Sequence, residues 1–313
     1  MDVYEQNRRL GRGMNILGYD PVWKSRSKAR MRDKHFRLIK EAGFNSVRIP
    51  LHPFRDAAID ERHRIVETWF ETLDWAVEQS LSNGLMVILD LHEFRAMGED
   101  PIGNRERFLA TWKQIGERYK DLSSEVIFEI LNEPNRNMTP ELWNRFHSEA
   151  MLIIRETNPH RTVIIGPGNW NDINYLDKLE LPEKDRNIIV TIHYYRPMEF
   201  THQGTDWTSY RDKVGIEWKG TAEERQTIMK DFQKAQAWAD RNDRPLFLGE
   251  FGAYDKADMN SRVRYISFVA RQAEKLGWSW AYWQFDSDFI AYDIPHDRWI
   301  DPIRDALVPS GAK

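Results

Sequence analysis

Eight short apolar runs alternate with longer amphipathic stretches along this sequence, and that repeat constrains the fold more than any other feature. Each run is continuously apolar or β-branched, as expected for parallel strands that are buried on both faces. The runs occupy residues 14–17, 45–50, 86–92, 126–134, 162–167, 188–195, 245–252 and 278–285. No low-complexity tract or linker rich in Pro, Gly or Ser separates them. We therefore expect a single catalytic domain over residues 1–313.

The stretches between the runs carry helix signals. Gly43 and Gly277 follow the stretches 27–42 and 261–276, and glycine is a favoured helix stop. Eight strands, each followed by a helix or a remnant of one, predict an α/β fold of the (β/α)8 or TIM-barrel type. A doubly wound sheet is the alternative. It is disfavoured because the G-x-G segment at 166–168 lacks the third glycine and the helix.

The composition excludes several classes of function. The chain has 45 Lys and Arg against 49 Asp and Glu, a net charge of −4, so it lacks the basic surplus expected for binding nucleic acid. No apolar run approaches the ~18 residues of a membrane span. With no cysteine, disulfide scaffolds, thiolate zinc sites and cysteine nucleophiles are excluded. His92-Glu93 lacks the second histidine of a zinc motif, so we expect no metal and no cofactor.

Polar, titratable or aromatic residues stand where the apolar runs stop. A barrel carries its chemistry at the carboxyl ends of the strands, so these side chains should converge on one rim. They are Asn15, Arg48, His92, Asn132, Glu133, Trp170, His193, Tyr195, Glu250 and Trp283. Each alone has an ordinary structural explanation, and the inference depends on the set. Glu129, four residues before Glu133, is expected to be a hydrogen-bonded interior group instead of a catalyst.

Two glutamates at this rim suit glycoside hydrolysis, which needs one protonated acid and one anion. Glu250 can accept hydrogen bonds from Arg48 and Tyr195, which would favour its ionised form. Asn132 places an amide beside Glu133. We therefore predict Glu133 as the acid/base and Glu250 as the nucleophile. Their carboxyl groups should lie about 5–5.5 Å apart, the separation for a retaining reaction.

Several motifs resemble glycoside hydrolase family 5. They are NSVRIP at 45–50, LNEPN at 131–135, TIHYY at 191–195 and LGEFGAY at 248–254. The resemblance covers nearly the whole chain, from RGMNILG at 12–18 to the final helix. It is closest to the thermophile-type endo-β-1,4-glucanases of that family, which share RFLATWKQIGERYKD at 107–121 and THQG at 201–204.

The resemblance implies a retaining endo-β-1,4-glucanase, or cellulase, with Glu133 as acid/base and Glu250 as nucleophile. Arg48, Asn132, His193 and Tyr195 would support the catalytic pair. The substrate contacts it implies are Asn15, His92, Glu93, Trp170, His202, Trp207, Trp283 and Gln284. The partner would be a β-1,4-glucan or mannan polysaccharide, and we expect a monomer.

Two residues depart from the relatives and leave the substrate open. Glu93 stands where relatives often have a second histidine, and Gln284 where they often have a glutamate. A β-mannanase or a mixed-linkage glucanase that uses the same catalytic residues is therefore an alternative. Strand alternation turns Glu93 away from the cleft if His92 points into it. We expect Glu93 to be a rim residue that is paired with Arg55 or Arg95 or bound to a sugar hydroxyl.

Two alternatives from other classes are disfavoured. A non-catalytic carbohydrate-binding barrel should have lost Glu133, Glu250 or Arg48. A phosphate-handling barrel needs a glycine-rich site after strands seven and eight, where residues 281–288 are aromatic and acidic. The first residues contain no apolar signal-peptide segment, although a polymer substrate favours an extracellular location.

Overall fold

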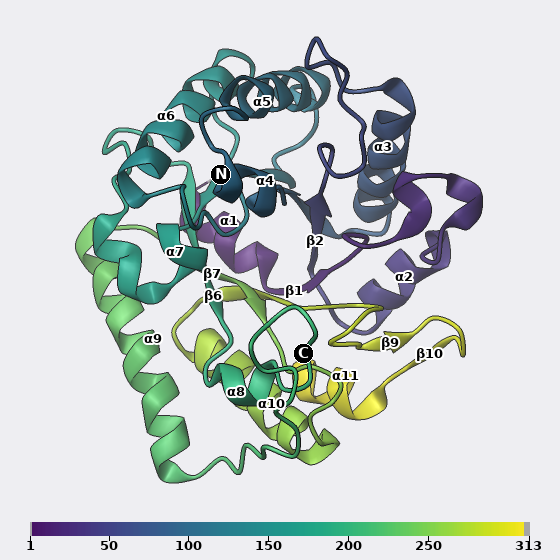
Figure 1. The fold of residues 1–313 in the computed structure, drawn as a ribbon, viewed down its shortest axis with the longest axis vertical. Helices are drawn as coiled ribbons and strands as arrows, with labels where there is room; N and C mark the ends of the chain where they lie inside the picture. The colour runs from purple at the N-terminus through teal and green to yellow at the C-terminus, as the bar shows by residue number, and fades with distance from the viewer. Residues whose placement is uncertain (1, 310–313) are drawn as a thin grey trace.

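A closed barrel of eight parallel strands forms the centre of the computed structural model, which describes residues 2–309 (Figure 1). The strands follow one another around the barrel in chain order, and the last pairs with the first. They are β1 (Arg12–Asn15), β2 (Ser46–Leu51), β3 (Met86–Leu91), β4 (Val126–Glu129), β5 (Val163–Ile165), β6 (Ile188–Tyr194), β7 (Leu246–Phe251) and β8 (Ser279–Tyr282). Each overlaps one predicted run. The (β/α)8 prediction is confirmed, and the doubly wound alternative is wrong.

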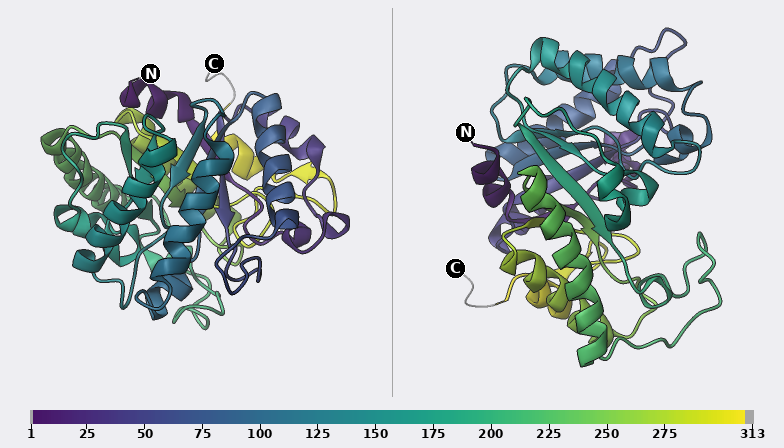
Figure 2. Two further views of the ribbon diagram at one scale, coloured as in Figure 1. Left: turned by 90° about the horizontal axis from the view of Figure 1, so that it is seen from above. Right: turned by 90° about the vertical axis from the view of Figure 1, so that its left-hand side faces the viewer.

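Helices surround the strands (Figure 2). The longer ones are α2 (Asp33–Glu41), α3 (Glu67–Ser82), α5 (Arg105–Tyr119), α6 (Pro140–Thr157), α9 (Ala222–Asn242), α10 (Met259–Lys275) and α11 (Asp301–Leu307). Their ends follow from local chemistry. Thr139 caps α6, which has Pro140 in its first turn, and Thr221 with Glu224 forms a capping box on α9, so backbone N–H groups at these ends find partners.

The remaining elements are short. After β5 the outer helix is reduced to α7 (Gly168–Asn171) and the 3-10 helix η3 (Ile173–Lys178). The loops also contain η1 (Pro21–Trp23), η2 (Arg26–Lys28), α4 (Phe94–Glu99), α8 (Met198–Thr201) and a hairpin of β9 (Tyr292–Asp293) and β10 (Arg298–Trp299). Within residues 2–309, no helix combines the length and apolar character needed to cross a bilayer.

The first helix, α1 (Val3–Leu10), closes the amino end of the barrel. Val3 and Leu10 pack with buried strand residues that include Ile88, Ile164 and Phe247. Burying such apolar side chains stabilises the fold by about 25 cal/mol per Å² of surface removed from water. Because this end is filled, access to the barrel lies at the opposite end, where the strands finish.

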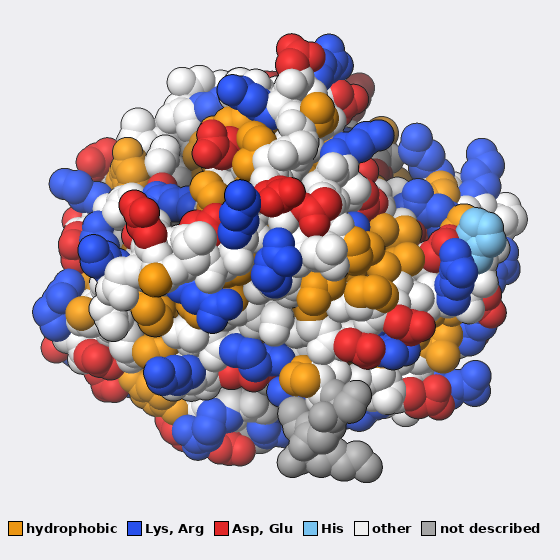
Figure 3. Space-filling model, turned by 90° about the horizontal axis from the view of Figure 1, so that it is seen from below, with side chains coloured by type: hydrophobic (Ala, Val, Ile, Leu, Met, Phe, Trp, Pro, Cys, Tyr) orange, Lys and Arg blue, Asp and Glu red, His pale blue; other side chains and the backbone are white. Residues whose placement is uncertain are grey.

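The surface of the described chain carries both signs of charge. Figure 3 shows Lys and Arg side chains interspersed with Asp and Glu over one face. This mixture agrees with the small net charge of −4.

Candidate active site

A cavity of about 910 Å³ opens at the carboxyl ends of the strands. Segments that follow β1, β3, β4, β5, β6 and β8 contribute to its wall, and β7 contributes Glu250. Among the lining residues are Tyr19, His92, Glu133, Trp170, His193, Tyr195, His202, Trp207, Glu250 and Trp283. Side chains at this end therefore converge, as the ends of the apolar runs predicted.

Arg48, on β2, lies wholly buried beneath this cavity. Its guanidinium binds both carboxylate oxygens of Glu129, at 2.7 and 2.8 Å, and lies 3.0 Å from Asp90. Glu129 is also fully buried, so the prediction that it is an interior hydrogen-bonded group is confirmed. Arg48 further donates to Asn15 at 2.9 Å, Asn132 at 2.8 Å and Glu250 at 2.8 Å.

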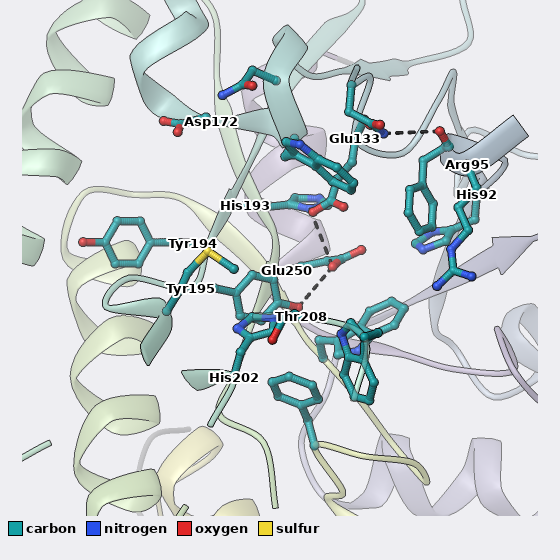
Figure 4. A pocket seen from close by; sticks show the side chains of 18 of the residues that line it. His92, Arg95, Glu133, Asp172, His193, Tyr194, Tyr195, His202, Thr208 and Glu250 are labelled. Atoms are coloured by element: carbon teal, nitrogen blue, oxygen red, sulfur yellow. Dashed lines mark hydrogen bonds and ion pairs between the residues drawn. The ribbon is translucent and has the colours of Figure 1, made fainter. Parts of the chain in front are cut away.

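Glu250, on β7, accepts two hydrogen bonds, one on each carboxylate oxygen. Arg48 donates to Oε1 at 2.8 Å. The Tyr195 hydroxyl donates to Oε2 at 3.1 Å (Figure 4). Burial raises the pKa of Glu250 to about 7, and Arg48 is among the groups that oppose the rise. The predicted partners of this carboxylate are therefore in place.

Glu133 follows β4 and faces Glu250 across the cavity floor (Figure 4). Its φ is 44°, a left-handed conformation that is rare for residues other than glycine and tends to occur at functional sites. Its Oε1 lies 2.8 Å from Nδ1 of His193. Burial raises the pKa of Glu133 to about 8, and the carboxylates of Asp90 and Glu129 add to the effect.

A register shift in the sheet brings the histidine to the two carboxyl groups. Between Ile192 and His193 the pairing of β6 with β7 slips by one residue, so that His193 pairs with Glu250 instead of Gly249. The ligand atoms of Glu133, His193 and Glu250 lie within 4.8 Å of one another. Within residues 2–309 these three form the one group that could hold a metal ion. One oxygen of Glu133 therefore lies within 4.8 Å of one oxygen of Glu250.

Aromatic side chains provide flat surfaces along the cavity. The Trp283 indole stacks on His92 at a centroid distance of 5.5 Å. Trp170 and Trp207 also line the cavity and are 40% and 45% exposed. Exposed indoles of this kind suit stacking on the apolar face of a sugar ring. His202 packs edge-on against Tyr195 at 4.8 Å.

Three residues expected to contact substrate are buried away from the cavity lining, namely Asn15, Glu93 and Gln284. The Asn15 amide donates to the carbonyl groups of Gly249, Ala281 and Tyr282, and its oxygen accepts from Arg48. Gln284 is only 2% exposed. Asn15 therefore supports Arg48 from below.

Glu93 was expected at the rim, either ion-paired or bound to a sugar hydroxyl, and the rim position is wrong. Strand alternation does turn it away from His92, but its carboxylate is buried and accepts from the backbone N–H groups of Phe54 and Arg55. Burial raises its pKa to about 7.

Glu93→Gln is expected to change how stability depends on pH. Because the pKa of Glu93 is raised above its usual value of 4.5, the native state binds this proton more tightly than the unfolded chain does. The resulting stabilisation is present below about pH 4.5 and is lost as the pH rises through about 7. Urea unfolding measures the free energy of unfolding of the variant and of wild type. The variant's value minus the wild-type value should be about 1–3 kcal/mol larger at pH 8 than at pH 5.

The matched control is Glu71→Gln, at an exposed position of α3, which should show no such pH-dependent difference. An equal effect of Glu93→Gln at both pH values would contradict this account of the buried carboxyl group.

Sequence reasoning missed several residues of the site. Tyr19, Phe94 and Arg95 line the cavity from the loops after β1 and β3. Asp90 lies below it and contacts Nδ1 of His92 at 2.6 Å. The spacing of Asp90 and His92, two apart on one strand, places both on the same face and could have revealed this pair. No comparable sequence pattern places Tyr19 in the cavity, because the path of its loop cannot be read from the residues.

The barrel and its two facing glutamates define the class of barrel glycoside hydrolases. Comparison with known proteins agrees, because the family model for cellulase (glycosyl hydrolase family 5) matches residues 8–288. The chain belongs to this family.

Similar proteins span nearly the whole chain. Endoglucanase H of Acetivibrio thermocellus is 35% identical over 99% of this chain. A hyperthermophilic endo-β-1,4-glucanase solved with substrate is 38% identical, with a TM-score of 0.93 over 98% of this chain and 99% of that one. Cel5A of Thermotoga maritima, solved with cellobiose, is 40% identical, with a TM-score of 0.92 over 98% and 100% of the two chains.

Some relatives are much longer than this chain. It covers 34% of Endoglucanase H and 52% of Endoglucanase 3 of Fibrobacter succinogenes, to which it is 26% identical over 95% of its own length.

Proposed function

We propose that this chain is a retaining endo-β-1,4-glucanase that uses Glu250 as nucleophile and Glu133 as acid/base. The observation that carries the proposal is the pair of carboxyl groups with oxygens within 4.8 Å of each other. So short a spacing favours a retaining reaction over an inverting one, in which the carboxyl groups stand about 6.5–9.5 Å apart to admit a water molecule. The different partners of the two groups support the division of roles.

In the first step, an oxygen of Glu250 attacks the anomeric carbon while the bond to the leaving sugar oxygen breaks. Glu133 gives its proton to that oxygen. Arg48 and Tyr195 hold the Glu250 carboxylate in place. In the second step, the Glu133 carboxylate takes a proton from water, and the resulting hydroxide displaces Glu250 from the anomeric carbon. Both glutamates then return to their starting protonation states.

A β-1,4-glucan is the substrate that the cavity and the relatives favour. Trp170, Trp207 and Trp283 offer stacking surfaces within one cavity, and the similar structures include endoglucanases bound to substrate or cellobiose. Mannan is the second candidate, because Cel5A of Thermotoga maritima, 40% identical to this chain, has also been solved with mannotriose.

A substrate panel with product analysis tests both parts of the proposal. Carboxymethylcellulose and barley β-glucan should be cleaved internally, giving a rapid fall in polymer length. Proton NMR of the earliest products should show the β anomer. Initial α product would contradict the retaining mechanism, whereas cleavage of mannan alone would overturn the preference for glucan.

The pH dependence of kcat/KM is expected to be bell-shaped and displaced towards neutral pH. Activity should fall as the pH drops through the pKa of Glu250, about 7, because the nucleophile becomes protonated. It should fall again as the pH rises through that of Glu133, about 8, because the acid loses its proton. The two limbs report the coupled pair. Rates on a soluble cello-oligosaccharide measure the curve, and an optimum near pH ~4, where unperturbed carboxyl groups titrate, would contradict it.

A further inference from the structure

The chain takes a left-handed turn directly after β5. Asn169, Trp170 and Asn171 have φ values of 54°, 67° and 54°. Residues with a Cβ seldom adopt this conformation, because the Cβ crowds the following carbonyl oxygen; asparagine takes it more readily than most, and tryptophan does not. Three in succession therefore require compensating contacts, and backbone strain of this kind gathers at functional sites.

The turn makes two contacts with the candidate catalytic groups. The Trp170 backbone N–H donates to the carbonyl of Pro134 at 3.0 Å, one residue after Glu133. The Asn171 side chain points inward, is fully buried, and places Nδ2 3.2 Å from Nε2 of His193. The left-handed turn therefore connects the loop of the proposed acid/base to the histidine that contacts it.

Two glycines make room for this arrangement. A Cβ on Gly166 would lie 2.2 Å from Oδ1 of Asn171, and one on Gly249 would lie 3.0 Å from Nε2 of His193. Any side chain at Gly166 would displace the amide.

The contacts of the two ring nitrogens determine where His193 carries its proton. Burial lowers the pKa of His193 to about 4, so the ring is neutral near pH 7 and has one donor and one acceptor. Its Nδ1 lies 2.8 Å from Oε1 of Glu133 and 3.6 Å from Oε2 of Glu250. The charged groups that face the ring are Glu133, Glu250, Arg48 and Glu129. An amide N–H directed at Nε2 makes that nitrogen the acceptor and leaves the proton on Nδ1.

We propose that Asn171 is a positioning residue that fixes the proton of His193 on Nδ1, where it donates to Oε1 of Glu133. Oε1 is then occupied, so the proton that Glu133 transfers to the leaving group is carried on Oε2. The inference rests on the proposed function, in which Glu133 is the acid/base. In this proposal the left-handed turn orients Glu133 through Asn171 and His193.

The direct test is nitrogen NMR of protein labelled with 15N-histidine, with the His193 signals assigned by their loss in His193→Gln. Wild type at neutral pH should show a protonated Nδ1 and an unprotonated Nε2. Asn171→Asp places an acceptor against Nε2 and should move the proton there or add a second one. The matched control Asn174→Asp makes the same charge change at an exposed residue of η3 and should leave these signals unchanged.

Kinetics provide a second readout. Asn171→Asp should lower kcat on glucan roughly 10–100-fold and shift the alkaline limb of the pH profile, with little change in KM. The rate of the first step on dinitrophenyl cellobioside should fall much less, because its leaving group needs no proton. Gly166→Ala displaces the amide without adding charge and should lower kcat on the same substrates.

A wild-type ring protonated on Nε2 would overturn the inference, even if Asn171→Asp failed to fold. An unaltered tautomer in a folded Asn171→Asp would also overturn it. These results are distinct from a failure of the proposed function, which would appear as an absence of glucan hydrolysis in a wild-type protein with the expected tautomer.

Discussion

Glu250→Gln is expected to lower turnover by at least about 10⁴-fold on every substrate, including those with activated leaving groups. The amide keeps the size of the carboxyl group. Its one oxygen can still accept from Arg48, and its NH2 group can donate to the Tyr195 hydroxyl oxygen. It cannot attack the anomeric carbon. Because the loss lies in bond formation at carbon, a better leaving group should not restore the rate. Initial rates on barley β-glucan and dinitrophenyl cellobioside measure the effect.

Chemical rescue makes this test more specific. In Glu250→Ala, azide can enter the space of the missing carboxylate and attack from the same side, giving an α-glycosyl azide. Glu71→Gln, at an exposed position, is the control for loss of a carboxylate and should retain full activity. Substantial turnover by Glu250→Gln, or a β-glycosyl azide from Glu250→Ala, would assign the nucleophile to another residue.

Glu133→Gln is expected to separate substrates by their leaving groups. Hydrolysis of glucan should fall by about 10²–10⁴-fold, the usual contribution of a general acid/base. Dinitrophenolate departs without a proton, so the first step on dinitrophenyl cellobioside should be nearly unaffected. The second step still needs a base to activate water. Stopped-flow absorbance should therefore show a fast burst of dinitrophenolate followed by slow turnover.

Azide distinguishes this residue from the nucleophile. It should accelerate turnover of Glu133→Ala by attacking the glycosyl-enzyme, and the product should be a β-glycosyl azide. Equal losses on glucan and on dinitrophenyl cellobioside would show that Glu133 does not protonate the leaving group.

The barrel was predictable because its signal is distributed along the chain. Strands buried on both faces must be apolar at nearly every position, so the run at 188–195 predicted β6 to within one residue. The approximate location of the site was predictable for the same reason. Once the strand ends are known, polar residues there, such as Glu133 and Glu250, must share one rim.

Side-chain direction was harder to predict than position along the chain. Asn15 and His92 both stand at strand ends, yet His92 lines the cavity and Asn15 lies below it. The difference depends on strand tilt and register, which the sequence does not display. Glu93 was misplaced for another reason. Its partners are backbone N–H groups of a distant loop, and backbone donors carry no residue-specific signal.

Closure of the barrel by α1 has a consequence for how the chain folds during synthesis. The amide of Asn7 donates to the carbonyl of Leu246 at 2.9 Å and accepts from the hydroxyl of Ser279 at 2.6 Å. Helix α1 is thus completed by strand residues that lie 239 and 272 positions later in the sequence. Until β7 and β8 have left the ribosome, α1 lacks these partners and its apolar face is incompletely covered. Contacts of such long sequence separation slow folding, so closure of this end of the barrel must wait until β8 has been synthesised.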